Sequence, residues 1–252
     1  MINDEIKAQT RKLKQMSARE KASYIYDYYK WHILGSVLAL TVLISVLAGF
    51  LTAKEPVFCV TMVNSYLTDP SQSTLLSDFS EAMPDFDPSR EKMVMECGIW
   101  MDPKALDALT VGYDQKLVAS FSAGTIDVML ADKDIIEKYA PFGVFEDLGQ
   151  LLDDSLLQEL KDGGYELLSY EIDPSVSEVP SPSAAGLCLP QSPVLSEGFE
   201  SPSGHSPYFN TEDGHLPVLA IPRSSTHKDA SVDFVRYLIR SDGWHPQPTT
   251  PQ

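Results

Sequence analysis

Five residues of this chain combine side chains that suit ligand binding with positions at the ends of predicted strands. They supply an amide, a hydroxyl, two aromatic rings and a carboxylate: Asn64, Ser65, Tyr66, Trp100 and Asp132. In an α/β domain, ligands bind at the carboxyl ends of the strands. Aromatic faces beside amide and carboxylate groups fit a sugar, a peptide or an amine. Each residue also has a structural interpretation, in which Trp100 packs in the core while Asn64 and Asp132 cap turns.

The sequence carries no pattern typical of catalysis, a metal site or a cofactor site. Its five histidines form no H-x-x-x-H or H-E-x-x-H pair: His32, His205, His215, His227 and His245. We interpret them as solvated loop residues. G-x-S-x-G, Walker and G-x-G-x-x-G motifs are also absent from the sequence. We therefore expect a protein that is not an enzyme and that holds no cofactor or metal.

The three cysteines, Cys59, Cys97 and Cys188, are far apart and form no C-x-x-C pair. An odd number cannot close a disulfide framework, and the spacing is unlike that of a metal site. We expect buried thiols that act as small apolar residues, with at most one disulfide in an oxidising exterior.

Alternating strands and helices position the five candidate residues. Three continuous apolar runs predict buried strands, at 57–65, 93–101 and 126–130. Apolar residues at helical spacing predict three helices, at 74–83, around 117–121 and at 134–139. Gly124 stands where the middle helix needs a left-handed cap. This alternation predicts an α/β domain with a mostly parallel sheet.

Two stretches resemble the extracellular, type 2 periplasmic solute-binding proteins. Residues 121–153 read FSAGTIDVMLADKDIIEKYAPFGVFEDLGQLLD, and five of them match the family pattern: Asp127, Asp132, Gly143, Leu148 and Leu151. Ile126 departs from that pattern, which usually has a Pro before the strand. Residues 217–242 are similar to the family's late strand and its "IP.sS.h...A..F..yL" segment. The resemblance implies a periplasmic-binding-protein-like fold without naming a ligand.

The second of these stretches also has a physical interpretation of its own. A short apolar strand is followed by Ser224–Thr226, which are available as a helix N-cap. Val235, Leu238 and Ile239 then fall on one face of a helix.

The chain is short for the two lobes that this family generally has. Residues 173–207, where a second lobe would lie, hold seven prolines among many Ser and Gly. So many prolines do not pack as an α/β lobe. We expect one lobe, with 173–207 mostly irregular around an ordered patch at 185–189.

Residues 33–53 form an apolar run of 21 residues without a charge, which predicts a transmembrane helix within 31–54. At ~1.5 Å per residue, the run matches a hydrocarbon core of roughly 30 Å. Aromatic residues precede it, as at a membrane boundary: Tyr24, Tyr26, Tyr28, Tyr29 and Trp31. The alternative is a signal peptide cleaved after Ala48, although the run is longer than a usual signal core.

Charge differs between the two sides of this run. Of the 19 basic and 36 acidic residues, 7 and 4 lie in residues 1–30, so residues 31–252 carry a formal charge of −20. The basic excess before the run predicts a cytoplasmic N-terminus. A surface as acidic as that of residues 31–252 repels phosphates, so nucleic acid is excluded as a partner.

These observations predict a cytoplasmic tail at 1–30, a span at 31–54, an extracytoplasmic domain at 55–245 and a disordered tail at 246–252. We expect a bacterial, single-pass cell-membrane protein that contacts lipid through 33–53 and binds a small ligand or a partner protein at the cell surface. One span forms no pore, so a transport role would be accessory to the separate permease of an ABC transporter. The alternatives are a structural or assembly scaffold with the same fold, and an extracytoplasmic enzyme.

Overall fold

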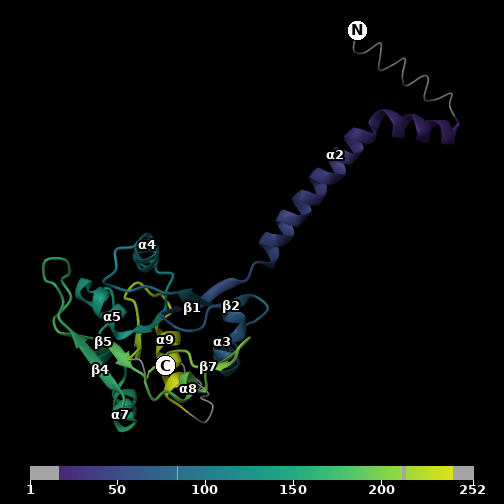
Figure 1. Cartoon of the computed structure of the whole chain (residues 1–252). Coiled ribbons are helices and arrows are strands. Elements are labelled where there is room, and N and C mark those ends of the chain that lie inside the picture. The colour runs from purple at the N-terminus through teal and green to yellow at the C-terminus, as the bar shows by residue number, and fades with distance from the viewer. Residues whose placement is uncertain (1–16, 84, 212–213, 241–252) are drawn as a thin grey trace, which may run out of the picture. The chain divides into compact units, whose positions relative to one another are not determined.

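The structure, a computed structural model, describes residues 17–83, 85–211 and 214–240. The chain divides into two compact units, Met1–Ala53 and Lys54–Gln252 (Figure 1). Residues 1–16 of the expected cytoplasmic tail and the expected disordered tail at 246–252 lie outside the described residues.

The first unit contains one long helix, α2 (Ala18–Thr52). Within the described residues, its segment Tyr29–Phe50 is the one stretch long and apolar enough to cross a membrane, with a mean hydropathy of 2.4. A signal sequence near an N-terminus passes the same test of length and composition. The hydroxyls of Thr41 and Thr52 donate to the carbonyls of Val37 and Ala48, so neither needs water.

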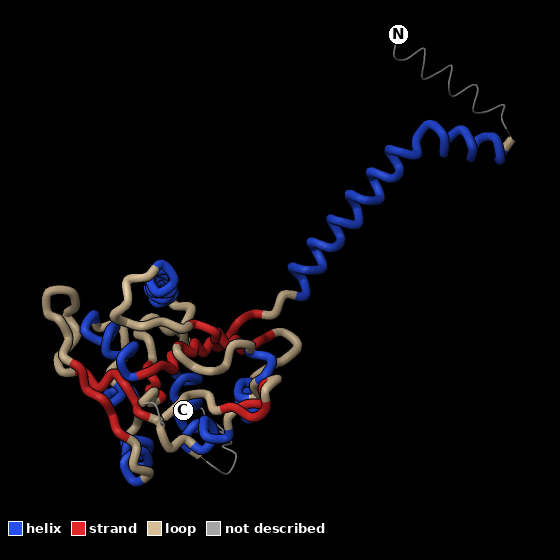
Figure 2. The backbone as a smooth tube through the Cα atoms, in the orientation of Figure 1, coloured by secondary structure: helices blue, strands red, loops and turns tan. Residues whose placement is uncertain are grey.

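The second unit is built on a six-stranded sheet in the order β2-β1-β3-β8-β5-β4 (Figure 2). The strands are β1 (Glu55–Val63), β2 (Glu91–Ile99), β3 (Val128–Asp132), β4 (Glu166–Tyr170), β5 (Ser183–Cys188) and β8 (Pro217–Ala220). Strand β1 pairs in parallel with β2 and β3, whereas the pairs β3–β8, β8–β5 and β5–β4 are antiparallel. The α/β class is confirmed, but the prediction of a mostly parallel sheet is wrong.

The reason for the mixed sheet lies in the second half of the chain. Strands β4 and β5 follow one another without an intervening helix, and consecutive strands joined by a loop pair in antiparallel fashion. Strand β8 then enters between β3 and β5 and runs against both. Only the first half keeps the strand–helix alternation that parallel pairing requires.

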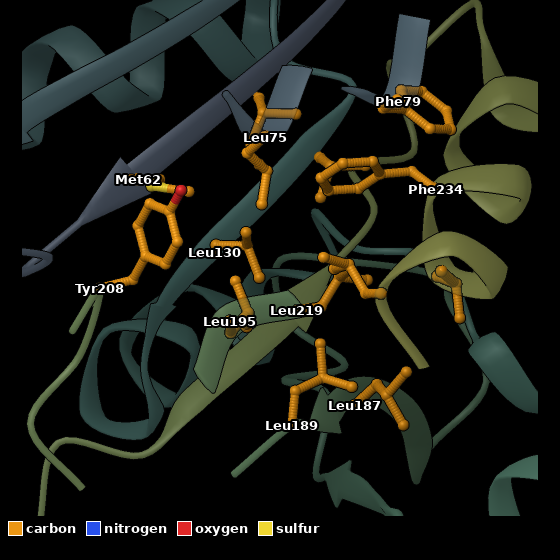
Figure 3. Packing of buried hydrophobic residues seen from close by; sticks show 14 of the residues in the cluster. Met62, Leu75, Phe79, Leu130, Leu187, Leu189, Leu195, Tyr208, Leu219 and Phe234 are labelled. Carbon is orange, nitrogen blue, oxygen red and sulfur yellow. The ribbon is translucent and has the colours of Figure 1, made fainter. Parts of the chain in front are cut away.

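Helices cover both faces of the sheet. One face packs on α3 (Leu75–Ala82), α6 (Leu148–Leu151), α7 (Asp154–Asp162), α8 (Pro193–Glu197) and α9 (Lys228–Ile239). The other packs on α4 (Ala108–Ala123) and α5 (Lys133–Tyr139), with the short 3-10 turn Ala140–Phe142 directly after α5. A second 3-10 turn, Pro70–Gln72, lies between β1 and α3 in the chain. Figure 3 shows the first core, where Leu219 on β8 lies between its strand partners Leu130 and Leu187. Every residue of β3 is buried because both of its faces are covered.

The sequence correctly predicts the cap at the end of α4 but not the cap at the start of α9. Gly124 ends α4 in the left-handed conformation, with φ of 64°, as predicted. A Cβ added there would lie 2.7 Å from the carbonyl oxygen of Ser224, so glycine is also required by close packing. The predicted N-cap of α9 within Ser224–Thr226 is wrong, because His227 holds that position.

Residues 173–207 are more ordered than predicted. The expected ordered patch at 185–189 overlaps β5, which ends at Cys188, but α8 and a small two-stranded sheet also form here, from β6 (Phe199–Ser201) and β7 (Gly204–Ser206). The prolines fall between these elements, except Pro193, which opens α8 at a position where a helix tolerates proline. The segment is therefore neither a second α/β lobe nor an irregular connection.

All three thiols are free. Cys188 is buried, as predicted, whereas Cys59 and Cys97 are half-buried. Burial raises the pKa of Cys59 and of Cys97 to about 11, so both thiols stay protonated at neutral pH.

Candidate functional site

The candidate site lies where the chain leaves the sheet in opposite directions. After β1 the chain enters α3 on one face, whereas after β2 and β3 it enters α4 and α5 on the other. Such a divergence opens a crevice at the carboxyl ends of neighbouring strands. A cavity of about 330 Å³ lies there, and its wall includes Asn64, Trp100 and Asp132.

Asn64 follows β1 in the left-handed conformation, with φ of 59°, which is uncommon for a residue other than glycine. Its side chain accepts from the backbone N–H of Met101 (2.8 Å) and donates to the carbonyl of Met101 (2.9 Å). The same amide nitrogen also donates to Oδ2 of Asp132, at 3.0 Å. Asn64 therefore joins the end of β1 to the ends of β2 and β3.

Asp132 is the last residue of β3 and keeps only 6% of its surface exposed. It precedes α5 at the N-cap position, yet its side chain caps no backbone N–H of that helix. Instead, Oδ2 accepts from Asn64, while Oδ1 is buried without a hydrogen-bond partner in the described part of the chain. Burial raises the pKa of Asp132, and the hydrogen bonds from His215 and Asn64 act in the opposite direction. The turn-capping interpretation does not explain this arrangement.

His215 also lies on the cavity wall. Its polar sequence context had predicted a solvated loop residue, and that prediction is wrong. Its Nδ1 lies 2.7 Å from Oδ2 of Asp132, although the two residues are 83 positions apart. The antiparallel direction of β8 brings them together, because Asp132 pairs with Pro217 at the start of that strand. Had β8 run parallel to β3, the residues before it would lie at the opposite edge of the sheet.

The two aromatic candidates form an exposed stack beside the cavity. The rings of Tyr66 and Trp100 are 5.9 Å apart and inclined by 19°, and Trp100 also lies 5.9 Å from the ring of His215. Trp100 is 47% exposed, so the core interpretation of this residue is wrong. Ser65 is buried and its hydroxyl donates to the carbonyl of Leu67, so it does not join Asn64, Trp100 and Asp132 on the cavity wall.

Charged residues at the cavity are mostly acidic. Asp102 and Asp134 lie on its wall together with Asp132, and one lysine, Lys133, lies there as well. Asp134 also forms a long ion pair with the exposed Lys104, at 3.8 Å. Within the described residues, no group of three or more His, Cys, Asp or Glu side chains is arranged to hold a metal ion. The site can therefore accept hydrogen bonds and offer aromatic faces.

A second Asp–His pair lies at the other end of β3. Oδ2 of Asp127 accepts from the backbone N–H of Cys59 at 2.8 Å. Its Oδ1 accepts from the hydroxyl of Ser225 at 2.6 Å and lies 3.1 Å from Nδ1 of His227. The hydroxyl of Ser231 in α9 also donates to the carbonyl of Asp127. This cluster fixes the start of α9 to the sheet.

Comparison of the chain with models of known protein families, with curated proteins and with solved structures finds no match. The resemblance to solute-binding proteins therefore stays a prediction from the residues of 121–153 and 217–242. The geometry of the cavity carries the functional argument.

Proposed function

We propose that this protein is a membrane-anchored, extracytoplasmic module that binds a small ligand in the cavity between Asn64, Trp100, Asp132 and His215. One observation carries the proposal: Asp132 is a buried carboxylate on the cavity wall, and one of its oxygens has no partner within the described residues. Leaving a buried acceptor unpaired destabilises a fold by about 1–3 kcal/mol, so a ligand that donates to this oxygen would recover that loss on binding.

The backbone at the site supports the same proposal. Asn64 has a left-handed backbone conformation. Residues other than glycine in this conformation are often found at ligand sites. Tyr66 and Trp100 form an exposed stack beside the cavity, and its apolar aromatic surface is available for a ligand to cover. Polar acceptors beside aromatic faces are the usual lining of a small-molecule site.

The anchoring part of the proposal rests on α2. Its stretch Tyr29–Phe50 has the length and hydropathy of a span, and the basic excess of residues 1–30 favours a cytoplasmic N-terminus. The intact protein should stay in the membrane fraction after carbonate washing, and protease added to protoplasts should remove the domain after residue 54. Recovery of a soluble form that begins near Gly49 would instead support a cleaved signal peptide.

Binding is tested on the full-length chain in detergent, by thermal-shift screening against sugars, short peptides and amines. A ligand that binds only the folded state raises the melting temperature. The shift should disappear in Trp100→Ala and persist in Phe142→Ala, because Phe142 is another exposed aromatic residue but lies outside the cavity wall. A screen without any such shift would favour the scaffold alternative. A confirmed ligand would fit a subunit that passes its ligand to a separate permease, as the resemblance implies.

The pair of His215 and Asp132 favours a second candidate function, an extracytoplasmic hydrolase. A carboxylate at Nδ1 holds a histidine in the tautomer whose Nε2 can accept a proton, which is the arrangement of a general base. The cavity wall holds no Ser, Thr or Cys nucleophile among the described residues, so the base would have to activate water. Hydrolysis of a model ester that is lost in His215→Gln would establish this second function.

A further inference from the structure

We propose that the cavity selects a small organic cation whose protonated amino group binds Asp132 while its apolar body packs on Trp100. This inference rests on the proposed binding function and specifies its ligand class. It draws on the charge balance of the wall, the unpaired oxygen of Asp132 and the aromatic stack.

Charge favours a cation over an anion. Among the described residues, three carboxylates lie on the wall, from Asp102, Asp132 and Asp134, against one lysine, Lys133. The side chain of Asp132 is only 9% exposed, and among the described residues the one basic side chain within 4 Å of it is that of His215. A partly desolvated carboxylate interacts with a nearby charge more strongly than an exposed one does, because less water screens it.

Hydrogen-bonding capacity points to an ammonium group. Oδ2 of Asp132 is occupied by Asn64 and His215, whereas Oδ1 lacks a donor within the described residues. An ammonium group carries three donors and no acceptor, so it can satisfy Oδ1 once the buried carboxylate turns that oxygen toward the cavity, and it adds no acceptor that the site must satisfy. A hydrogen bond between charged partners contributes roughly twice as much as a neutral one.

The aromatic stack supports the same ligand class. Trp100 is 47% exposed and stacks on Tyr66, and indole is the aromatic ring that attracts cations best. The cavity, at about 330 Å³, lies at the small end of the usual range for ligand sites, which runs from about 300 to 1,000 Å³. The ligand is therefore a compact amine rather than a long polycation or a protein segment.

The test uses three probes that share one body and differ in charge: 2-phenylethylamine, 2-phenylethanol and 3-phenylpropanoate. Calorimetric titration of the full-length chain in detergent at pH 7 should give an affinity for the amine at least about tenfold above that for the alcohol, since a charge-assisted hydrogen bond exceeds a neutral one by about 1.4 kcal/mol. The carboxylate probe should bind most weakly.

Two variants locate the effect. Asp132→Asn should reduce the affinity for the amine to that for the alcohol, and Trp100→Leu should weaken the binding of the amine through loss of the cation–aromatic contact. Glu197→Gln is the matched control, because it removes an exposed carboxylate that is outside the cavity wall. Circular dichroism checks that each variant is folded, and the three probes still test the wild-type chain if one is not.

The outcomes separate this inference from the function on which it rests. If the alcohol or the carboxylate binds as tightly as the amine, the cation inference is wrong while ligand binding stands. The same holds if none of the three probes binds but a sugar or a peptide gives a shift that Trp100→Ala abolishes. If nothing in the wider screen binds, the proposed function fails, and the cation inference fails with it.

Discussion

The two ends of strand β3 each carry an aspartate beside a histidine, but the two carboxylates differ in how completely they are hydrogen-bonded. At the amino end, both oxygens of Asp127 have partners, in Cys59, Ser225 and His227. The same cluster ties α9 to the sheet through Ser231. Within the described residues, the carboxylate of Asp127 therefore has a partner for each oxygen.

At the carboxyl end, Asp132 and His215 lie closer together, at 2.7 Å, yet the carboxylate is incompletely satisfied. Its neighbours are an exposed aromatic stack and Asn64 in a left-handed conformation. An Asp–His pair alone therefore does not identify a ligand site. What distinguishes the two ends is whether the surrounding groups complete the hydrogen bonds of the acid.

The largest expected effect is on stability at the amino end. Asp127→Ala removes the acceptors for three hydrogen bonds, including one from the backbone of Cys59, and should cost roughly 3–5 kcal/mol of unfolding free energy. Urea unfolding of the full-length chain in detergent measures this loss. A loss below about 1 kcal/mol would show that the cluster is not the structural tie described here.

A smaller loss is expected for Asn64, which serves both the fold and the site. Asn64→Ala leaves the buried N–H of Met101 unpaired and places alanine in the left-handed region, at a combined cost of roughly 2–4 kcal/mol. Asn64→Gly removes the same hydrogen bonds without the backbone strain, so it should cost about 1 kcal/mol less. Equal losses in the two variants would contradict the strained backbone at this residue.

Trp100 distinguishes a site residue from a core residue. Because nearly half of its surface is exposed, Trp100→Ala should cost only about 1 kcal/mol, whereas truncation of a buried tryptophan costs about 3–5 kcal/mol. The variant should also lose any ligand-induced thermal shift. A large loss of stability in the same urea experiment would show that Trp100 contributes to folding as a core residue does.

The smallest effect is expected at Asp132, and its sign is opposite to that at Asp127. The pKa of Asp132 is raised in the folded state, so the protonated form favours folding and this contribution is lost as pH rises through that pKa. At pH 7 the ionised side chain therefore destabilises the free domain, and Asp132→Asn should be slightly more stable than the wild type. The difference should shrink on acidification, because the wild type gains stability as Asp132 takes up its proton. Urea midpoints of both proteins at pH 7 and pH 4 test this, and a clear loss in Asp132→Asn at pH 7 would assign the residue a structural role.

The sequence predicted the first half of the sheet well because its signals there are local. Strand β3 begins with a fully buried apolar run, residues 128–131, and Gly124 follows a helical pattern at the position where a left-handed cap is expected. Once the strands were located, the rule that ligands bind at their carboxyl ends put Asn64, Trp100 and Asp132 at one edge. The structure places those three on one cavity wall.

The direction of β8 explains the missed histidine and contributes to the error about the sheet. Strand direction depends on pairing between residues far apart in the chain, such as Asp132 and Pro217, and no local pattern encodes it. The assumption of a mostly parallel sheet therefore hid the position of His215. The segment 173–207 was misjudged for a related reason, since its prolines fall in the turns between short elements that pair only in the folded domain.

The central place of β8 also affects how the domain is made. During synthesis, β1, β2 and β3 leave the ribosome long before residues 217–220, so the inner edges of β3 and β5 stay unpaired in the interval. A contact between such distant segments slows folding, because a long loop must close before the pairing stabilises it. Until β8 is synthesised, the nascent chain would therefore hold two open sheet edges rather than a shortened domain, and it would depend on chaperones during that interval.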